Sequence, residues 1–354
     1  MVDDDSGAET APDAATDTDA TTDTAASSGA LPATGDATEV ADRFPRDDDP
    51  LAEAVEAALS DRSGVVAVGV PIRLLPSILA ARERSSGPPW RVACRPGVVD
   101  ALSRALVLGT AVAEAAETDA IRVRAGRALD HGTGGTLFAS PDRVDAVVGP
   151  PGDRTLATTV ADDDSGAASA TGARETFDGT AAAETRFDVA TAASVGMPSR
   201  RRLVAAAREI LDDRFADDVA AVLKSIAPGE FGRTGEPSDR TLLVALAARH
   251  DHLFRDLRRW VGTKGVGIAP AQEFTRDRRA LVERELIESI KVPMGPGRPM
   301  LRLRAVDDAL LRARPEEVPS VLKGRFGLPT DADGRLRHEA SREGRRPVWE
   351  RRRW

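Results

Sequence analysis

Apolar positions along the first folded segment change repeatedly between helical and strand spacing. PLAEAVEAALS, which starts at Pro50, has apolar residues at helical spacing, and the apolar run VVAVGV after it is typical of a strand buried on both faces. Helical spacing returns from Leu74 to Leu79 and from Val98 to Ala116. The predicted strands are VVAVGV, WRVACR, IRVRA, TLFAS and, as the last one, VDAVVG. Helices that alternate with buried strands predict an α/β regulatory domain with a parallel or mixed sheet over residues 50–160.

Two segments connect this domain to the rest of the chain. Residues 161–185 consist mainly of small and polar residues, which predicts a low-complexity linker or insertion. Residues 197–236 predict a helical connector, because their apolar residues form one stripe. The stripe consists of Leu203, Ala207, Ile210, Leu211, Phe215, Val219, Val222 and Leu223. We expect this connector to pack between the domains or against a second subunit.

The pattern of residues 237–328 predicts three helices followed by a hairpin. TLLVALAARH, HLFRDLRRWV and AQEFTRDRRALVERELI have helical spacing, with Ser238 and Asp251 as expected N-caps and Pro270 at the start of the third. KVPMGPGRPMLRLR then predicts two short strands around a turn rich in glycine and proline. This order is that of an α+β winged helix-turn-helix domain, in which the third helix is presented to DNA.

The third predicted helix carries the candidate base-reading residues. Phe274, Leu281 and Leu286 form its apolar stripe. A different stripe, at i, i+3, i+4 and i+7, holds Gln272, Thr275, Arg276 and Arg279, whose side chains can hydrogen-bond to base edges and phosphates. The alternative is an ordinary solvated helix face, because acidic residues such as Glu273 and Asp277 lie close by in the sequence.

The predicted hairpin supplies further candidate contacts to DNA. Strand alternation predicts that Leu301 and Leu303 face the helices while Arg302 and Arg304 face solvent. The tip, residues 295–298, is narrow enough to reach a minor groove or a phosphate. The candidate DNA contacts of the hairpin are Lys291, Arg298, Arg302 and Arg304. The alternative, a bare tight turn, has no use for so many arginines.

Charge is distributed very unevenly along the 354 residues. The net charge is −8, but the first 50 residues hold 14 acidic residues and two arginines, so the remaining chain carries +4. The acidic segment 1–49 lacks large apolar residues, which predicts a disordered tail. Residues 329–354 predict a basic flexible tail that adds phosphate contacts, docks as a peptide or has no role of its own. The abundance of Asp, Thr, Ala and Arg and the low Lys content are typical of a high-salt cytoplasm, and no signal peptide or membrane span is indicated.

Motifs for catalysis, metals and cofactors are weak. Cys94, the single cysteine, has apolar neighbours that favour a buried strand residue. His250 and His252 are interpreted as solvated or capping residues, so no metal site is expected. The HGTGG run from His131 lacks the lysine and the spacing of phosphate-binding loops, and no cofactor is expected. An enzyme is therefore the minority interpretation.

The C-terminal half resembles a known family in several short motifs. These are GIA at Gly267 to Ala269, KVP at Lys291 to Pro293, GRP at Gly297 to Pro299 and LRL at Leu301 to Leu303, together with Phe274, Arg276 and Leu286-Ile287. In these motifs the chain resembles the haloarchaeal TbsP-like transcriptional regulators, and the similarity extends more weakly back to about Pro50. The resemblance implies an N-terminal α/β domain, a C-terminal winged helix and regulation of central carbon metabolism genes.

The function predicted from these features is sequence-specific binding to double-stranded DNA. The N-terminal domain is expected to sense a small-molecule metabolite or to form a homodimer. The alternative is a protein-interaction adaptor whose winged helix docks another protein instead of DNA.

Overall fold

The computed structural model describes residues 50–126, 135–150, 153–160, 170–226, 238–263, 266–295 and 299–326. The predicted acidic tail, residues 1–49, and the basic tail, residues 329–354, lie outside these ranges, as do Arg298 and the stretch from His131 to Gly134.

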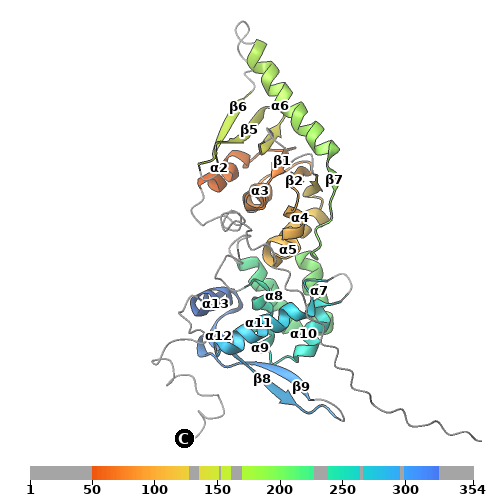
Figure 1. Ribbon diagram of the computed structural model, residues 1–354, viewed down its shortest axis with the longest axis vertical. Coiled ribbons are helices and arrows are strands. Elements are labelled where there is room, and N and C mark those ends of the chain that lie inside the picture. The colour runs from red at the N-terminus through yellow and green to blue at the C-terminus, as the bar shows by residue number, and fades with distance from the viewer. Residues whose placement is uncertain are drawn as a thin grey trace, which may run out of the picture.

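The N-terminal half is built around one mixed sheet (Figure 1). Its elements are α2 (Pro50–Leu59), β1 (Val66–Val70), η1 (Ile72–Leu74), α3 (Leu75–Arg84), β2 (Trp90–Cys94), α4 (Val98–Leu102), α5 (Leu106–Glu117), β3 (Ile121–Ala125), β4 (Leu137–Ser140), β5 (Arg143–Val148), β6 (Thr155–Val160), α6 (Ala170–Val189) and β7 (Thr191–Ala192). The described strands lie in the order β6-β5-β4-β1-β2-β3-β7. Strands β1, β2 and β3 are parallel, and every other pairing is antiparallel. The predicted α/β domain with a mixed sheet is thus present.

Strand β1 is buried on both faces, as its continuous apolar run predicts. Val66 and Val68 face a cluster that contains Phe187 of α6, whereas Ala67 faces the main core. At Gly69 the strand has a bulge with φ of 68°, a left-handed conformation that favours glycine. Cys94 is fully buried in β2, as expected, and burial raises the pKa of its thiol to about 12.

The segment predicted as a linker, residues 161–185, is largely helical where it is described. Helix α6 begins at Ala170, and its buried Ala183 and Phe187 pack on the sheet. Over residues 170–185 the structure thus has a helix that packs on the sheet, where the sequence predicted a low-complexity linker or insertion. Within this stretch a buried residue as small as Ala183 gives little apolar signal. Strands β6 and β7 were also missed, since the prediction ended the sheet at β5.

The C-terminal half is mainly helical. Its elements are α7 (Arg200–Ile210), α8 (Asp213–Ser225), α9 (Arg240–Arg249), α10 (Phe254–Val261), α11 (Ala271–Glu283), β8 (Ile287–Val292), β9 (Met300–Ala305), α12 (Asp308–Arg312), η3 (Pro315–Glu317) and α13 (Val318–Phe326). The predicted connector corresponds to α7 and α8, separated by Asp212, whose side chain caps α8 by accepting from the Phe215 backbone N–H at 2.8 Å. Most of the predicted apolar stripe, including Leu203 and Val219, is buried.

One hydrophobic core runs through both halves. The Asp239 carboxylate, just before α9, accepts a hydrogen bond from the Val107 backbone N–H of α5 at 3.0 Å. Helix α5 also approaches the connecting segment closely at Gly109, where an added Cβ would lie 2.8 Å from Met197 Cγ. Trp260 of α10 donates its indole N–H to the Leu203 carbonyl of α7 at 3.3 Å. The C-terminal helices are therefore held against the sheet domain through α5 and α7.

Candidate nucleic-acid interface

Helix α11 lies across the C-terminal half, next to α9 and α10 and just above the β8–β9 hairpin (Figure 1). Phe274 and Leu281 of the predicted apolar stripe are fully buried on its inner side. Leu286, its third member, is also buried but lies outside the helix, because α11 ends at Glu283 and β8 begins at Ile287. Pro270 stands at the N-cap, one position before the expected one, and has no N–H that would need a partner there.

A buried carboxylate fixes the N-terminal half of α11 to α9. Asp277 accepts hydrogen bonds from Ser238 Oγ at 3.0 Å and Thr241 Oγ1 at 3.4 Å, and its Oδ2 lies 3.5 Å from Arg240 Nε. Arg240 also pairs with Glu273 at 3.0 Å. Burial raises the pKa of Asp277, although Arg240 opposes that shift. Ser238 was expected to cap α9; its side chain binds Asp277 instead, and α9 begins after Asp239.

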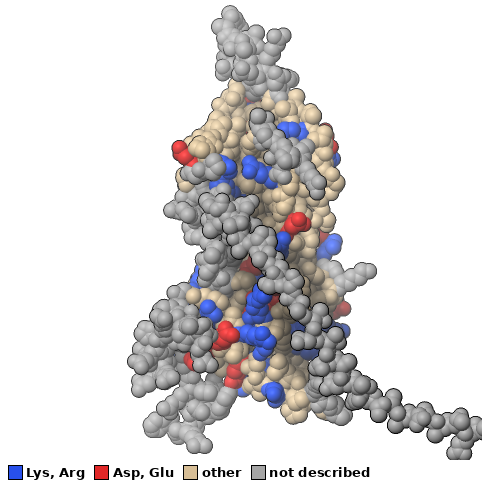
Figure 2. Space-filling view, viewed as in Figure 1, with Lys and Arg blue, Asp and Glu red and all other residues tan. Residues whose placement is uncertain are grey.

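The outer face of α11 presents three of its four predicted candidates to solvent. Gln272, Arg276 and Arg279 are exposed, and Arg276 is 82% exposed with only a 4.0 Å approach to Glu273. Among the described residues, Arg279 and Gln272 have no side-chain hydrogen bond or ion pair. Thr275 is half-buried, and its hydroxyl donates back to the Ala271 carbonyl at 3.2 Å. In Figure 2, Lys and Arg side chains are visible on both halves of the molecule, including the region of the C-terminal helices.

Two other arginines near the end of α11 are used inside the protein. Arg278 donates to Ser289 Oγ at 2.8 Å and lies 5.4 Å from the centre of the Phe254 ring. Arg284 stacks on Phe326 at 4.0 Å. Burial lowers the pKa of both guanidinium groups. Arg278 and Arg279 are thus neighbours in sequence with different roles, because one helical step of about 100° turns one inward and the other outward.

The hairpin is joined to the helices along β9. Leu303 is buried, as expected, and its N–H donates to the His252 carbonyl at 2.9 Å, while Arg302 forms an isolated antiparallel bridge with Leu253. Leu253 thus adds a short strand-like contact beside β9.

The hairpin arginines differ from the prediction that they face solvent freely. Arg302 is half-buried with its Nε enclosed, because the chain around Leu253 runs beside it. Arg304 pairs with Asp251 at 3.0 Å. Asp251 was expected to cap α10, but it has a left-handed φ of 57° and α10 begins at Phe254 without a side-chain cap. Lys291 is exposed, and Arg298 lies outside the described residues.

Sequence reasoning missed the arginines of α10. Phe254, Leu257 and Trp260 are its buried face, so Arg255, Arg258 and Arg259 are exposed. Arg255 approaches Asp256 at 3.3 Å, and Arg258 lies 6.0 Å from the Phe254 ring centre. The same periodicity that identified α10 could have indicated this basic face.

His250 stands at the C-cap of α9, as the capping interpretation allows, and the side chains of both histidines contact acidic residues of α8 or its N-cap. His250 Nε2 lies 2.9 Å from Asp218, and His252 Nε2 lies 3.3 Å from Asp212. Both rings pack edge-on against Phe215. Only the solvated alternative was wrong, because the partners Asp218 and Asp212 lie 32 and 40 residues earlier in the chain, in α8 and at its N-cap. Within the described ranges, no group of three or more His, Cys, Asp or Glu residues is arranged to hold a metal.

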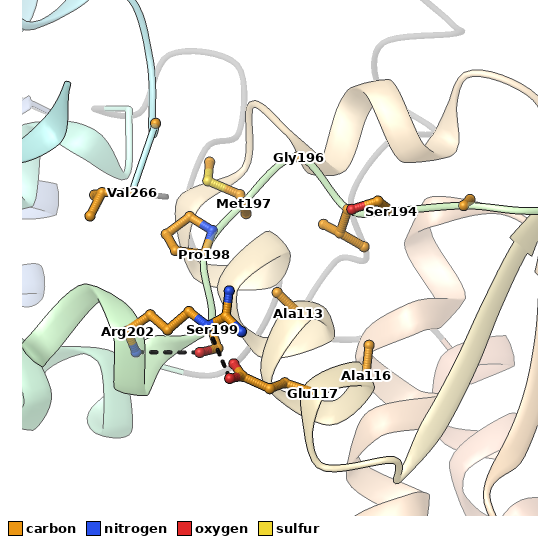
Figure 3. Close-up of a pocket in the computed structure, with 13 residues that line it drawn as sticks. Ala113, Ala116, Glu117, Ser194, Gly196, Met197, Pro198, Ser199, Arg202 and Val266 are labelled. Carbon is orange, nitrogen blue, oxygen red and sulfur yellow. Dashed lines mark hydrogen bonds and ion pairs between the residues drawn. The ribbon is translucent and has the colours of Figure 1, made fainter. Parts of the chain in front are cut away.

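A hollow of about 600 Å³ lies where the sheet domain meets the C-terminal helices (Figure 3). One wall is α5, with Ala113 and Glu117, and the opposite side includes Val266 and Gly267 in the turn before α11. Glu117 pairs with Arg202 of α7 at 2.9 Å. A hydrogen bond from Ser199 lowers the pKa of Glu117, and Arg202 adds to this effect. The hollow therefore touches both the sheet domain and the turn that leads into α11.

Helices α9, α10 and α11 with an exposed cationic face on the third are arranged as in the helix-turn-helix class of DNA-binding proteins. Comparison with protein families agrees with this class. A model described as "Transcriptional regulator TbsP-like, N-terminal" matches residues 46–198, and one described as "Transcriptional regulator TbsP-like, C-terminal HTH domain" matches residues 199–323. The matches are contiguous and cover most of the chain, so the chain belongs to the TbsP-like transcriptional regulators.

The expected two-domain organisation, an N-terminal α/β domain followed by a helix-turn-helix domain, is confirmed by these matches together with the fold. No curated protein and no solved structure matches the chain significantly. None of the described helices combines the length and the apolar character needed to cross a bilayer.

Proposed function

We propose that this chain regulates transcription by binding double-stranded DNA through a winged helix-turn-helix, with α11 in the major groove and β8–β9 as the wing. The observation that carries the proposal is the outer face of α11, where Gln272, Arg276 and Arg279 are exposed and two of them have no partner among the described residues. Arginine and glutamine can each form two hydrogen bonds to a base edge, so this face suits sequence reading.

The winged arrangement is supported by the contact between β9 and the start of α10. Leu253 pairs with Arg302, and the Leu303 N–H binds the His252 carbonyl, so the hairpin is attached beside the helices. In this arrangement Lys291 on β8 and Arg259 on α10 contact phosphates on either side of α11, and Thr275 lies at the edge of the reading face. Arg302 and Arg304 support the wing and add charge near the backbone.

The N-terminal sheet domain is proposed to sense a metabolite or to form a homodimer, and the chain is proposed to act in the cytoplasm as a regulator rather than an enzyme. The hollow of about 600 Å³ between the sheet domain and the C-terminal helices supports coupling between the domains, because its walls include α5 and the turn that precedes α11. The similarity in sequence to the haloarchaeal members is the basis for proposing genes of central carbon metabolism as targets.

The direct test is to map binding sites genome-wide with and without a sugar carbon source, and to titrate the purified chain against the recovered sites. We expect enriched promoter sites, and Arg276→Ala should weaken binding and blur base preference, whereas Arg298→Ala should weaken binding to all sequences evenly. If no promoter sites are enriched and the purified chain does not bind promoter DNA, the adaptor alternative is supported instead.

A further inference from the structure

A basic crevice lies between α7 and α8, away from the proposed DNA-reading face of α11. Its volume is about 500 Å³, and it is lined by Arg200, Arg201, Arg208, Lys224 and Glu114 around an apolar floor. The floor consists of Val204, Ala205, Ala220 and Leu223. A smaller hollow of about 250 Å³, which shares Arg200 and Glu114 with the crevice, lies towards α3 and the sheet. Arg200 therefore lies between two hollows.

Arg200 is a half-buried cation without a partner among the described residues. Its Nε and Nη2 atoms are enclosed and have no hydrogen-bond acceptor, and no ion pair with Arg200 is present among the described residues. Burial lowers the pKa of Arg200, while Glu83 and Glu114 partly offset this from beyond ion-pair distance. An arginine remains protonated under such conditions, and an enclosed charge with unmade hydrogen bonds is costly. Because Arg200 lines both hollows, an anion in the crevice would lie beside a guanidinium that has no partner among the described residues.

The other cations of the crevice differ in how far they are already used. Arg201 pairs with Glu114 at 2.7 Å, and Arg208 pairs with Asp213 at 2.9 Å and Asp217 at 2.6 Å. Lys224 is exposed and has no ion pair within the described part of the chain. Arg200 and Lys224 are therefore the two lining cations that have no ion pair among the described residues.

We propose that this crevice binds a small phosphomonoester with an apolar body. The phosphate would accept hydrogen bonds from Arg200 and Lys224, and the apolar body would cover Val204 and Leu223. Two uncommitted positive charges suit the dianionic phosphate, and the apolar floor distinguishes such a ligand from inorganic phosphate.

The position of the crevice connects it to the DNA-binding helices. Helix α7 receives the hydrogen bond from Trp260 of α10 at the Leu203 carbonyl, and Phe215 of α8 packs edge-on against Trp260 with 5.2 Å between ring centres. A ligand between α7 and α8 would contact both helices that support α10. A regulatory role for this ligand rests on the proposed function, whereas its binding does not.

The test is a calorimetric titration of the full chain with phenyl phosphate at constant ionic strength. We expect saturable binding that is weaker for inorganic phosphate, which lacks the apolar body, and absent for benzyl alcohol, which lacks the charge. Arg200→Ala should weaken phenyl phosphate binding by about tenfold or more, in line with the loss of a charge-assisted hydrogen bond. Lys224→Ala should also weaken it, and because Lys224 is exposed this variant keeps the test valid if Arg200→Ala does not fold.

The matched control is Arg214→Ala, which removes an exposed arginine from α8 outside the crevice and should leave the affinity unchanged. Unchanged affinity in Arg200→Ala and Lys224→Ala, or no binding of phenyl phosphate by the wild type, would overturn the proposal. If phenyl phosphate does not bind but Arg200→Ala weakens binding to every DNA sequence, the crevice is a DNA contact instead. Arg276→Ala separates the two ideas, because it should weaken DNA binding and leave phenyl phosphate binding intact.

Discussion

Helix α11 and the β8–β9 hairpin are neighbours in sequence and both carry several arginines, but these arginines differ in what they contact. On α11, Arg276 and Arg279 extend into solvent, with only a 4.0 Å approach between Arg276 and Glu273. On the hairpin, Arg304 pairs with Asp251 at 3.0 Å and Arg302 has its Nε enclosed.

This difference shows that the number of arginines in a segment does not measure the charge available to DNA. A side chain already held by a carboxylate must break that contact before it can bind a phosphate, which reduces its net contribution. In the proposed function, α11 therefore reads the sequence, and the hairpin and α10 position the domain on DNA.

The largest expected effect concerns the inner side of α11. Asp277→Ala should lower the free energy of unfolding by about 3 kcal/mol, because Arg240 and two hydroxyl groups lose a buried partner. Denaturant unfolding measures this loss. Glu283→Ala, an exposed acidic residue of the same helix, is the control and should change stability by less than about 0.5 kcal/mol. Equal effects in the two variants would mean that Asp277 does not anchor α11.

A second prediction concerns Asp239, which attaches the start of α9 to the sheet domain. Burial raises the pKa of Asp239 to about 6, despite the hydrogen bond from the Val107 N–H. Between about pH 4 and pH 6, the Asp239 carboxyl is protonated in the folded chain but ionised in the unfolded chain. The free energy of unfolding should therefore fall by about 3 kcal/mol as pH rises through this range.

Asp239→Asn keeps an oxygen acceptor for Val107 and cannot ionise, so the variant should gain stability relative to the wild type as pH rises from about 4 to 6. The measurement is the unfolding free energy of both proteins across that range. Parallel pH profiles would contradict the assignment.

On the outer face, Arg276→Ala and Arg279→Ala should each weaken binding to a specific site by about 1–3 kcal/mol, or roughly fivefold to 150-fold. Fluorescence anisotropy with a matched and a substituted site measures both affinity and base preference. Arg312→Ala removes an exposed arginine of α12 and serves as the charge control. A loss as large in Arg312→Ala as in Arg276→Ala would indicate a general charge effect instead of base reading.

The smallest effect is expected at the hairpin. Arg304→Ala should cost at most about 1 kcal/mol of stability, because its pair with Asp251 is partly exposed. It should also weaken DNA binding less than Arg276→Ala, with no change in base preference. A double-mutant cycle of Arg304→Ala and Asp251→Ala measures the coupling, and a loss of base preference in Arg304→Ala would remove the distinction between the helix and the hairpin.

The sequence by itself determined the features that depend on local periodicity. Spacing alone predicts the buried run of β1 and the burial of Phe274 and Leu281. It also predicts that Gln272, Arg276 and Arg279 are exposed on the opposite side of their helix. These features are encoded within a few turns of the chain, because each residue's direction is set by its own helix or strand.

Only the tertiary structure decided which polar groups are used internally and which segments complete the sheet. Asp277 with Ser238, Arg304 with Asp251 and His250 with Asp218 all join residues more than 30 positions apart. Helix α6, whose composition indicated a linker, likewise packs on strands that come earlier in the chain. Pairing across such distances depends on how whole elements pack, and the local pattern of hydrophobic and polar residues carries no record of it.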